Sequence, residues 1–323
     1  MILAFHRLTP FLRPALASIV GQTFADWELL LVDDGTGTGL SALGDEGRDP
    51  RVRLIAQHRQ RGIGAAHNAA VEAARGEFIA FMDYDDVAMP QRFERQVAAL
   101  RAEPEVVLLG SHALGIDEAG RLLGPQFTLP EPADQRTFIA YSMPATSPTF
   151  MGRREVLRRH PFRPEFLYSG EYDQLTRVAE EGVIKALPEV LLHYRVHAGQ
   201  TTTSGHDAQV FGACLARLLT ARRRAGRPEN LPELAAELAG WLTAAPAQPA
   251  SYAWFARRCL KEGFPLLAVY HARKLLSVSR APRDISLAGL VFARAAGRKP
   301  RQFGLLTRLF FTGPLRAHGL KPC

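Results

Sequence analysis

The chain has 323 residues, about twice the length of a common single domain, so it can hold one large core and an appendage. Its hydrophobic fraction of 47 % and charged fraction of 22 % are those of a globular protein, which excludes a mainly disordered, collagen-like or low-complexity chain. The three cysteines, Cys214, Cys259 and Cys323, are too few and too scattered for a disulfide framework or a zinc site, and they indicate a reducing compartment.

The net charge of +8 is unevenly distributed along the chain. Residues 1–197 carry 21 Lys and Arg against 26 Asp and Glu, a net charge of −5, whereas residues 198–323 carry a net charge of +13. Such a basic appendage indicates an anionic partner, or else an arginine-rich helical surface in solvent. Its basic residues are spread out and no nucleic-acid motif occurs, so we expect no nucleic-acid partner.

Strands and helices are predicted to alternate over the first hundred residues. The apolar runs predict strands at Met1–Phe5, Leu29–Val32, Val52–Ala56 and Phe78–Met82. Helical spacing follows Thr9-Pro10 and recurs over Gly64–Ala74 and after Pro90. Strand and helix alternating at this pitch predict an α/β domain with a mostly parallel, helix-covered sheet.

The pattern is looser after residue 100. Further strands are predicted at Val106–Gly110, Ile184–Leu187 and Val190–Val196, and a short extended segment at Thr149–Met151. A hairpin turn is predicted at Asp117–Gly120 and a helix at Asp173–Glu181. Beyond residue 200 the sequence predicts four to six helices and no strand, among them Ala208–Arg224, Leu231–Leu242, Tyr252–Lys261 and Pro265–Leu276. The chain is therefore predicted to end in an all-α region.

Two of the predicted strands end in acidic residues. Asp33 and Asp34 follow the strand at 29–32, and Asp83, Asp85 and Asp86 follow the strand at 78–82. In an open parallel sheet the ligand lies beyond the carboxyl ends of the strands, so both groups are expected to face one crevice.

Each acidic group has a functional and a purely structural explanation. Three carboxylates within four residues repel one another, and a hard divalent cation that bridges to substrate phosphates is the usual remedy; alternatively, Asp86 caps the helix that follows. Asp33 and Asp34 can accept hydrogen bonds from a base or from ribose hydroxyls. Because Asp-Gly favours turns, that pair is equally explained as a turn signal.

Several motifs in a fixed order resemble the family 2 glycosyltransferases over about residues 1–203. They are Gln22-Thr23-Phe24, Trp27–Val32 with Asp33-Asp34-Gly35, Gly62–Asn68, Ala74–Asp86, Leu187–Leu192 and Tyr194–Thr201. The resemblance implies a GT-A fold and the inverting transfer of a sugar from a nucleotide diphosphate, most often UDP. It also implies a division into a catalytic domain, residues 1–203, and a basic helical region, residues 204–323.

The resemblance assigns nucleotide-sugar binding to residues of the first strands and the first long helix. Asp33 and Asp34 match the pair that holds the nucleoside. Ala4 and His6 stand in the first-strand motif, where His6 can stack on the base. His67 stands where the family usually has an arginine that helps to hold the diphosphate; a histidine reaches less far and is charged only below about pH 6.5.

The metal and catalytic residues are also assigned by the resemblance. Asp83 and Asp85 match the motif that holds ribose and Mg²⁺ or Mn²⁺, and His197 matches a position that can face the metal. The catalytic carboxylate falls on Glu171 or Asp173, where the family has a Glu-Asp pair. We favour Glu171, although its side chain is one methylene longer than that of the expected aspartate.

The function that this resemblance predicts is transfer to a hydroxyl of a glycan or lipid-linked acceptor, in polysaccharide and cell-envelope biosynthesis. The alternative is a nucleotide-sugar binding module that has lost catalysis, with Glu171 and His67 as the marks of that loss. The chain has no apolar run of 18 residues and no evident signal peptide, so we expect a cytoplasmic protein. Residues 264–276 and 303–311 mix apolar and basic residues, which suggests either peripheral docking at the inner face of the plasma membrane or a packed helical core.

Overall fold

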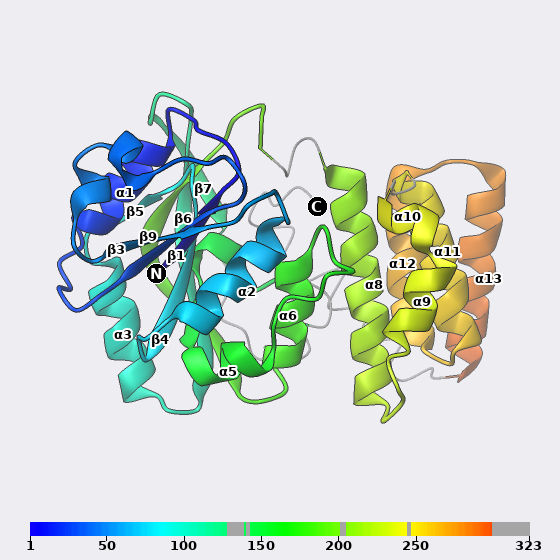
Figure 1. Ribbon diagram of the computed structural model, residues 1–323. Helices are drawn as coiled ribbons and strands as arrows, with labels where there is room; N and C mark the ends of the chain where they lie inside the picture. Colours follow the sequence, from blue (N-terminus) through cyan, green and yellow to red (C-terminus); the bar gives the residue numbers. More distant parts are fainter. Residues whose placement is uncertain (128–138, 140–142, 201–204, 244–246, 299–323) are drawn as a thin grey trace. The chain divides into compact units, whose positions relative to one another are not determined.

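The computed structural model describes residues 1–127, 139, 143–200, 205–243 and 247–298. The chain divides into two compact units, residues 1–204 and residues 205–323. The first unit contains a sheet with helices on both faces, and the described residues of the second unit form only helices (Figure 1). The predicted α/β class with an all-α C-terminal extension is confirmed.

One half of the sheet is parallel. Strands β1 (Ile2–Phe5), β2 (Leu29–Asp33), β3 (Val52–Ala56) and β4 (Phe78–Asp83) lie in the spatial order β3, β2, β1, β4. Every residue of β1 and β2 is buried, as expected for central parallel strands that are covered on both faces. Strands β2 and β4 therefore flank β1.

The other half of the sheet is mixed. Beyond β4 come the antiparallel β8 (Met151–Arg153) and then β6 (Val106–Ile116), which pairs in parallel with β9 (Val183–Arg195). Strand β6 also pairs antiparallel with β7 (Leu122–Phe127), and β9 with the short β5 (Val87–Ala88). The parallel arrangement predicted from the sequence is therefore found among β3, β2, β1 and β4, and the sheet as a whole is mixed.

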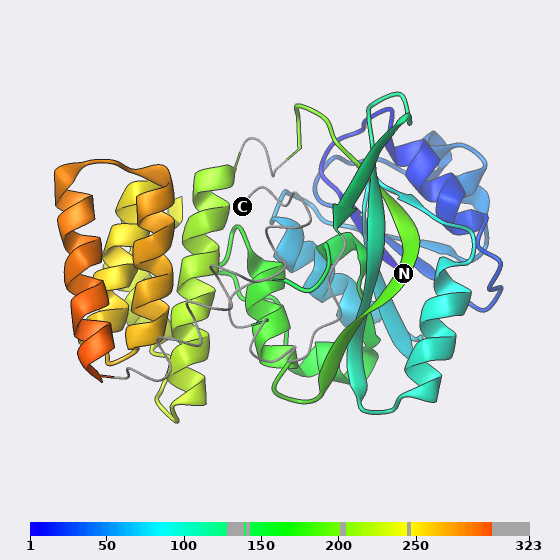
Figure 2. The same cartoon turned by 180° about the vertical axis from the view of Figure 1, so that it is seen from behind.

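Helices cover both faces of the sheet. One face carries α1 (Leu12–Val20) and α3 (Arg92–Ala102), and the other carries α2 (Ile63–Ala73), α5 (Arg154–Arg159) and α6 (Gly170–Val178) (Figures 1 and 2). Each contributes apolar residues to the core; α1, for example, buries a leucine, alanine and isoleucine stripe at helical spacing. Short 3₁₀ turns occur at Leu40–Leu43, Glu46–Arg48 and Ser147–Thr149.

Three predicted elements differ in detail from the structure. The two strands predicted at 184–187 and 190–196 form the single strand β9, because Pro188 and Glu189 are passed over in the pairing with β6. Proline lacks the N–H that a ladder needs, and a bulge accommodates it without ending the strand. The segment predicted as extended at 149–151 begins as a 3₁₀ turn, and the helix predicted at 231–242 is broken near Leu238.

The second unit is a group of helices with its own core. They are α8 (His206–Arg224), α9 (Leu231–Glu237), α10 (Ala239–Thr243), α11 (Gln248–Lys261), α12 (Pro265–Val278) and α13 (Pro282–Arg298). Helices α11, α12 and α13 pack on one another, and α8 packs on α11. Cys214 and Cys259 are buried in this core as free thiols.

Segment 264–276, one of the two considered for a membrane surface, belongs to the core of the second unit. In α12 the side chains of Leu267, Ala272 and Leu275 are buried, so the packed-core explanation applies to this segment. Residues 303–311 lie outside the described residues. Across the described chain, no helix combines the length and the apolarity needed to cross a membrane.

Candidate functional site

The carboxyl ends of β2 and β4 lie on opposite sides of β1. In the sheet register, Asp33 is opposite Phe5 and Asp83 is opposite Ala4. Both acidic groups therefore lie at the same edge of the sheet, as expected from parallel strands that end in acidic residues.

Three carboxylates gather in the turn that follows β4. Asp83, Asp85 and Asp86, called the acidic cluster below, each place one carboxylate oxygen within 4.8 Å of the other two. Asp86 is 1 % exposed; its Oδ1 atom accepts a hydrogen bond from the backbone N–H of Arg195, and its Oδ2 atom has no partner among the described residues. Helix α3 begins after Gln91, so the alternative role of Asp86 as its cap is not observed.

Burial and mutual repulsion raise the pKa values of the acidic cluster. The pKa of Asp83 rises to about 8, first because burial disfavours its charged form and then because Asp85 and Glu171 lie nearby. The pKa of Asp86 rises well above its ordinary value, mainly through burial and also through Asp83 and Asp85. Carboxyl groups in such surroundings bind either protons or a cation.

The acidic cluster fits the divalent cation that the family resemblance implies. Mg²⁺ and Mn²⁺ prefer oxygen ligands, and a cation would offset the repulsion and engage the unpartnered oxygen of Asp86. The predicted ligands Asp83 and Asp85 are both in the cluster, and Asp86 is a third. The third predicted ligand, His197, contacts Asp85: its Nε2 lies 2.8 Å from Oδ2 of that aspartate. Its role as a metal ligand stays a prediction.

The role of Arg195 was not predicted from the sequence. Besides its N–H bond to Asp86, its guanidinium donates to the carbonyl oxygens of Asp85, Asp117 and Glu118, at 2.8, 2.9 and 3.1 Å. Arg195 thereby fixes the turn that carries the acidic cluster. One indication of this role was present in the sequence: Arg195 stands two residues before His197, within the motif Tyr194–Thr201.

Asp33 and Asp34 hold loops rather than facing open space. Asp33 accepts hydrogen bonds from the backbone N–H groups of Thr36 and Thr38, at 2.7 and 2.8 Å. Asp34 accepts from the N–H groups of Arg61 and Gly62, at 2.7 and 2.9 Å. The pair therefore shapes the two loops beside the predicted nucleoside site, while its proposed contact with the nucleoside stays a prediction.

Glu171 and Asp173 lie on the same helix in different surroundings. Glu171 is in the first turn of α6, directly after Ser169-Gly170, and Ser169 has a φ of 58°, which L residues rarely adopt. Burial raises the pKa of Glu171. Asp173 is fully buried, and Arg163 and Arg177 bind its carboxylate. Asp173 thereby braces α6, and the catalytic role of Glu171 or Asp173 stays a prediction.

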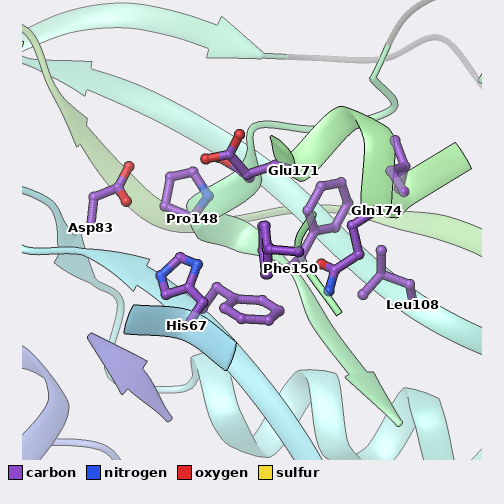
Figure 3. A pocket seen from close by; sticks show the side chains of 11 residues that line it. His67, Asp83, Leu108, Pro148, Phe150, Glu171 and Gln174 are labelled. Carbon is purple, nitrogen blue, oxygen red and sulfur yellow. The ribbon is translucent and has the colours of Figure 1, made fainter. Parts of the chain in front are cut away.

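A pocket joins Glu171 to the acidic cluster. Figure 3 shows Asp83 and Glu171 on the same cavity, with Pro148 and His67 beside them. The lining is His67, Phe81, Asp83, Leu108, Ser147, Pro148, Phe150, Phe162, Glu171, Gln174 and Leu175. A mainly apolar wall with a few converging polar groups is the usual character of a small-molecule site.

His67 is the polar group on the α2 side of this pocket. It is 4 % exposed, and burial lowers its pKa to about 4. The ring is therefore neutral near pH 7 and cannot supply the positive charge that an arginine would give a diphosphate. The lowered pKa strengthens the contrast with arginine that the sequence already indicated, while the contact of His67 with the donor stays a prediction.

The two first-strand residues lie at the edge of the acidic cluster. Ala4 is buried in β1 beside Asp83. His6 is exposed, and its ring packs edge-on against that of Tyr84, with 5.9 Å between the ring centroids. Arg7 links this region to a later loop, since its guanidinium donates to the Tyr84 hydroxyl at 3.0 Å and to the carbonyl oxygen of Gly199 at 2.8 Å. That link was not predicted from the sequence. The only indication of it was the position of Tyr84 within the acidic motif.

Comparison with known sequences places the first half of the chain in a described family. Residues 1–160 match the sequence model of Glycosyl transferase family 2. An uncharacterized glycosyltransferase of Methanocaldococcus jannaschii is 29 % identical over 193 residues, which are 58 % of this chain and 66 % of the relative. The UDP-Glc:alpha-D-GlcNAc-diphosphoundecaprenol beta-1,3-glucosyltransferase of Escherichia coli is 29 % identical over 114 residues, which are 35 % of this chain and 45 % of the relative. The match thus spans less than the full length of both relatives.

A solved structure has a related fold. TarS of S. aureus, residues 1–349 in complex with UDP, superposes with a TM-score of 0.56 at 16 % identity, covering 93 % of this chain and 91 % of that chain. At this identity the likeness concerns the fold alone. Together with the sheet and the helical second unit, it confirms the fold class expected from the sequence.

Proposed function

Residues 1–160 belong to Glycosyl transferase family 2, and from this premise we propose that the chain transfers a sugar from a nucleotide diphosphate to a hydroxyl group, with inversion at the anomeric carbon. Residues 1–203 would form the catalytic domain, with the basic helical region, residues 204–323, as its appendage. A UDP-sugar is the proposed donor, since the name of the E. coli relative specifies UDP-Glc and TarS was solved with UDP.

One observation carries the proposal: Asp83 and Glu171 line the same pocket. Each meets a different requirement of the reaction. The acidic cluster would hold a cation and, through it, a diphosphate, whereas burial raises the pKa of Glu171, as suits a group that accepts a proton. A donor held at the cluster would present its sugar towards Glu171.

The proposed role of Glu171 is that of general base. The acceptor hydroxyl is a weak nucleophile, and Glu171 would accept its proton as the oxygen attacks the anomeric carbon. The new C–O bond forms as the bond from the anomeric carbon to the diphosphate oxygen breaks, so a single displacement inverts the centre. Asp83, Asp85 and Asp86 would hold Mg²⁺ or Mn²⁺, which would supply positive charge to neutralise the departing diphosphate.

The proposed acceptor is a glycan or a lipid-linked sugar of a polysaccharide or cell-envelope pathway. The support is the name of the E. coli relative, whose acceptor is a GlcNAc-diphosphoundecaprenol. Peripheral attachment to a membrane is not part of the proposal, because the apolar residues of α12 are buried in the second unit.

A donor screen tests the proposal directly. Release of UDP, GDP or dTDP is measured from a panel of nucleotide sugars with Mn²⁺, with and without candidate glycan acceptors. We expect release from one donor class, dependent on metal and abolished in Asp85→Ala. If every donor in the panel binds without hydrolysis or transfer, the chain is instead the non-catalytic nucleotide-sugar binding module; if none binds, the proposal fails.

A further inference from the structure

His67 is held in an aromatic cage on the wall of the pocket. This aromatic cage consists of Phe81 and Phe162, whose ring centroids each lie 5.1 Å from that of His67 and 6.2 Å from each other. The cage is itself fixed, since Asn68 exchanges two hydrogen bonds of 2.8 Å with the backbone of Phe162. A Cβ at Gly64, one turn earlier on α2, would lie 3.1 Å from Cβ of Phe162. The imidazole is therefore positioned before any ligand arrives.

Neither ring nitrogen of His67 has a hydrogen-bond partner among the described residues. Both Nδ1 and Nε2 are buried and unpaired. Leaving a buried polar group unpaired costs about 1–3 kcal/mol, so such groups are rare in folded proteins unless a ligand or water engages them. The fold thus bears a cost at His67 that packing alone does not explain.

The surroundings of His67 select the kind of group that can pair with it. The neutral ring offers one N–H donor and one nitrogen acceptor. The other polar side chains on this wall are Asp83, Ser147, Glu171 and Gln174, none of which supplies a positive charge to a phosphate. An uncharged group that both donates and accepts, such as a sugar hydroxyl, suits these side chains.

We propose that His67 hydrogen-bonds a hydroxyl of the sugar being transferred and is thus a specificity-determining residue for the donor. The inference rests on the proposed function and deepens it. It assigns the aromatic cage to the sugar, and it leaves the diphosphate to the cation of the acidic cluster. His67 would distinguish donors by the hydroxyl that they present, rather than by charge.

The test compares a nucleotide with its sugar derivative on two variants. His67→Phe fills the cage without a hydrogen-bonding group, and His67→Gln keeps a donor and an acceptor. Both are made in a Glu171→Gln background so that the donor is not consumed. Calorimetry with Mn²⁺ measures two dissociation constants for each protein. One is for the donor that the screen identifies, such as UDP-GlcNAc, UDP-glucose or GDP-mannose, and the other is for the matching nucleotide, UDP or GDP.

We expect His67→Phe to weaken binding of the nucleotide sugar about tenfold or more, equivalent to about 1.4 kcal/mol, and to change nucleotide binding less than about twofold. His67→Gln should recover part of the loss. A deoxy donor that lacks the contacted hydroxyl should bind the wild-type residue weakly and be insensitive to His67→Phe.

Two results overturn the inference while leaving the proposed function intact: an equal loss for nucleotide and nucleotide sugar, or no loss for either. Absence of binding and turnover for every donor with the wild-type residues would instead contradict the proposed function, and the inference with it. Thermal unfolding of both variants shows whether the fold is retained; if His67→Phe does not fold, His67→Gln and the deoxy donors decide between the outcomes.

Discussion

Nε2 of His197 lies 2.8 Å from Oδ2 of Asp85, which joins the segment after β9 to the turn after β4 across 112 positions of sequence. The side chains are 6 % and 14 % exposed. Because the contact is largely buried, it restricts the orientation of one carboxylate of the acidic cluster. In the proposed site, His197 would therefore act on the cation through Asp85, as a residue that positions a ligand.

The first prediction concerns this contact. His197→Ala should weaken Mn²⁺ binding about 10–100-fold, since loss of a group that orients a metal ligand typically has an effect of this size. Calorimetric titration of the protein with Mn²⁺ measures it. His193→Ala is the matched control, because His193 lies four residues earlier in β9 and should change the affinity less than about twofold by the same reasoning. Equal effects of the two changes would contradict the positioning role.

A second prediction separates the two carboxylates of α6. Glu171→Gln should lower the transfer rate about 10²–10⁴-fold, the usual contribution of a general base, with nucleotide binding retained. Asp173→Asn should instead destabilise the fold by about 3–5 kcal/mol, because it removes the buried partner of Arg163 and Arg177. Rates from the donor screen and urea unfolding curves measure the two effects. If Asp173→Asn lowers only the rate and Glu171→Gln lowers only the stability, the assignment is reversed.

The sequence predicted those features that depend on neighbouring residues. The strands around β1 are continuous apolar runs, and each acidic group follows its strand directly, so periodicity and turn chemistry were enough to place them. The placement of Glu171 in the same pocket as Asp83 could not be predicted in this way, since the two residues come from segments that are distant in sequence.

The uses of individual polar side chains were the least predictable feature. Asp33 and Asp34 follow a strand just as Asp83 does, yet their oxygens are taken up by loop N–H groups. The sequence indicated that His67 is a weaker cation than arginine, but its burial against Phe81 and Phe162, which lowers its pKa to about 4, was not predictable. Such outcomes depend on packing between distant segments, and local patterns carry no information about them.

A third prediction concerns the pH dependence of stability. The pKa of Asp83 is about 8 in the folded chain against a reference value of 3.8, so the folded state binds more protons between these values. Stability from this group is therefore present at low pH and is lost as the pH rises towards 8. Asp83→Asn should raise the unfolding temperature of the metal-free protein at pH 8 and change it little at pH 5.

Added Mn²⁺ should reverse the same loss. With metal present, the unfolding temperature should rise more at pH 8 than at pH 5, because the cation competes with protons for the cluster. Differential scanning fluorimetry of both proteins across this range measures the effect. Asp45→Asn is the control, as Asp45 has a side chain 92 % exposed. If the difference in unfolding temperature between Asp83→Asn and the unaltered chain does not change with pH, Asp83 does not cause the effect.

The last prediction tests the loops that Asp33 and Asp34 hold. Gly35 and Gly37 both have positive φ, 90° and 74°, so alanine at either position is strained. At Gly35 a Cβ would also lie 2.4 Å from the backbone nitrogen of Gln60, whereas at Gly37 it meets nothing within 4 Å. Gly35→Ala forces the two loops apart, and Gly37→Ala does not.

Gly37→Ala should therefore cost about 1–2 kcal/mol from backbone strain alone. Gly35→Ala should cost about 1–3 kcal/mol more, because the clash adds an overpacking term. Urea unfolding measures the stabilities, and UDP titration of the same variants measures the consequence for binding. Since the separated loops flank the predicted nucleoside site, Gly35→Ala should also weaken UDP binding more than Gly37→Ala does. Equal UDP affinities, with the expected difference in stability, would mean that these loops shape the fold without contacting the nucleotide.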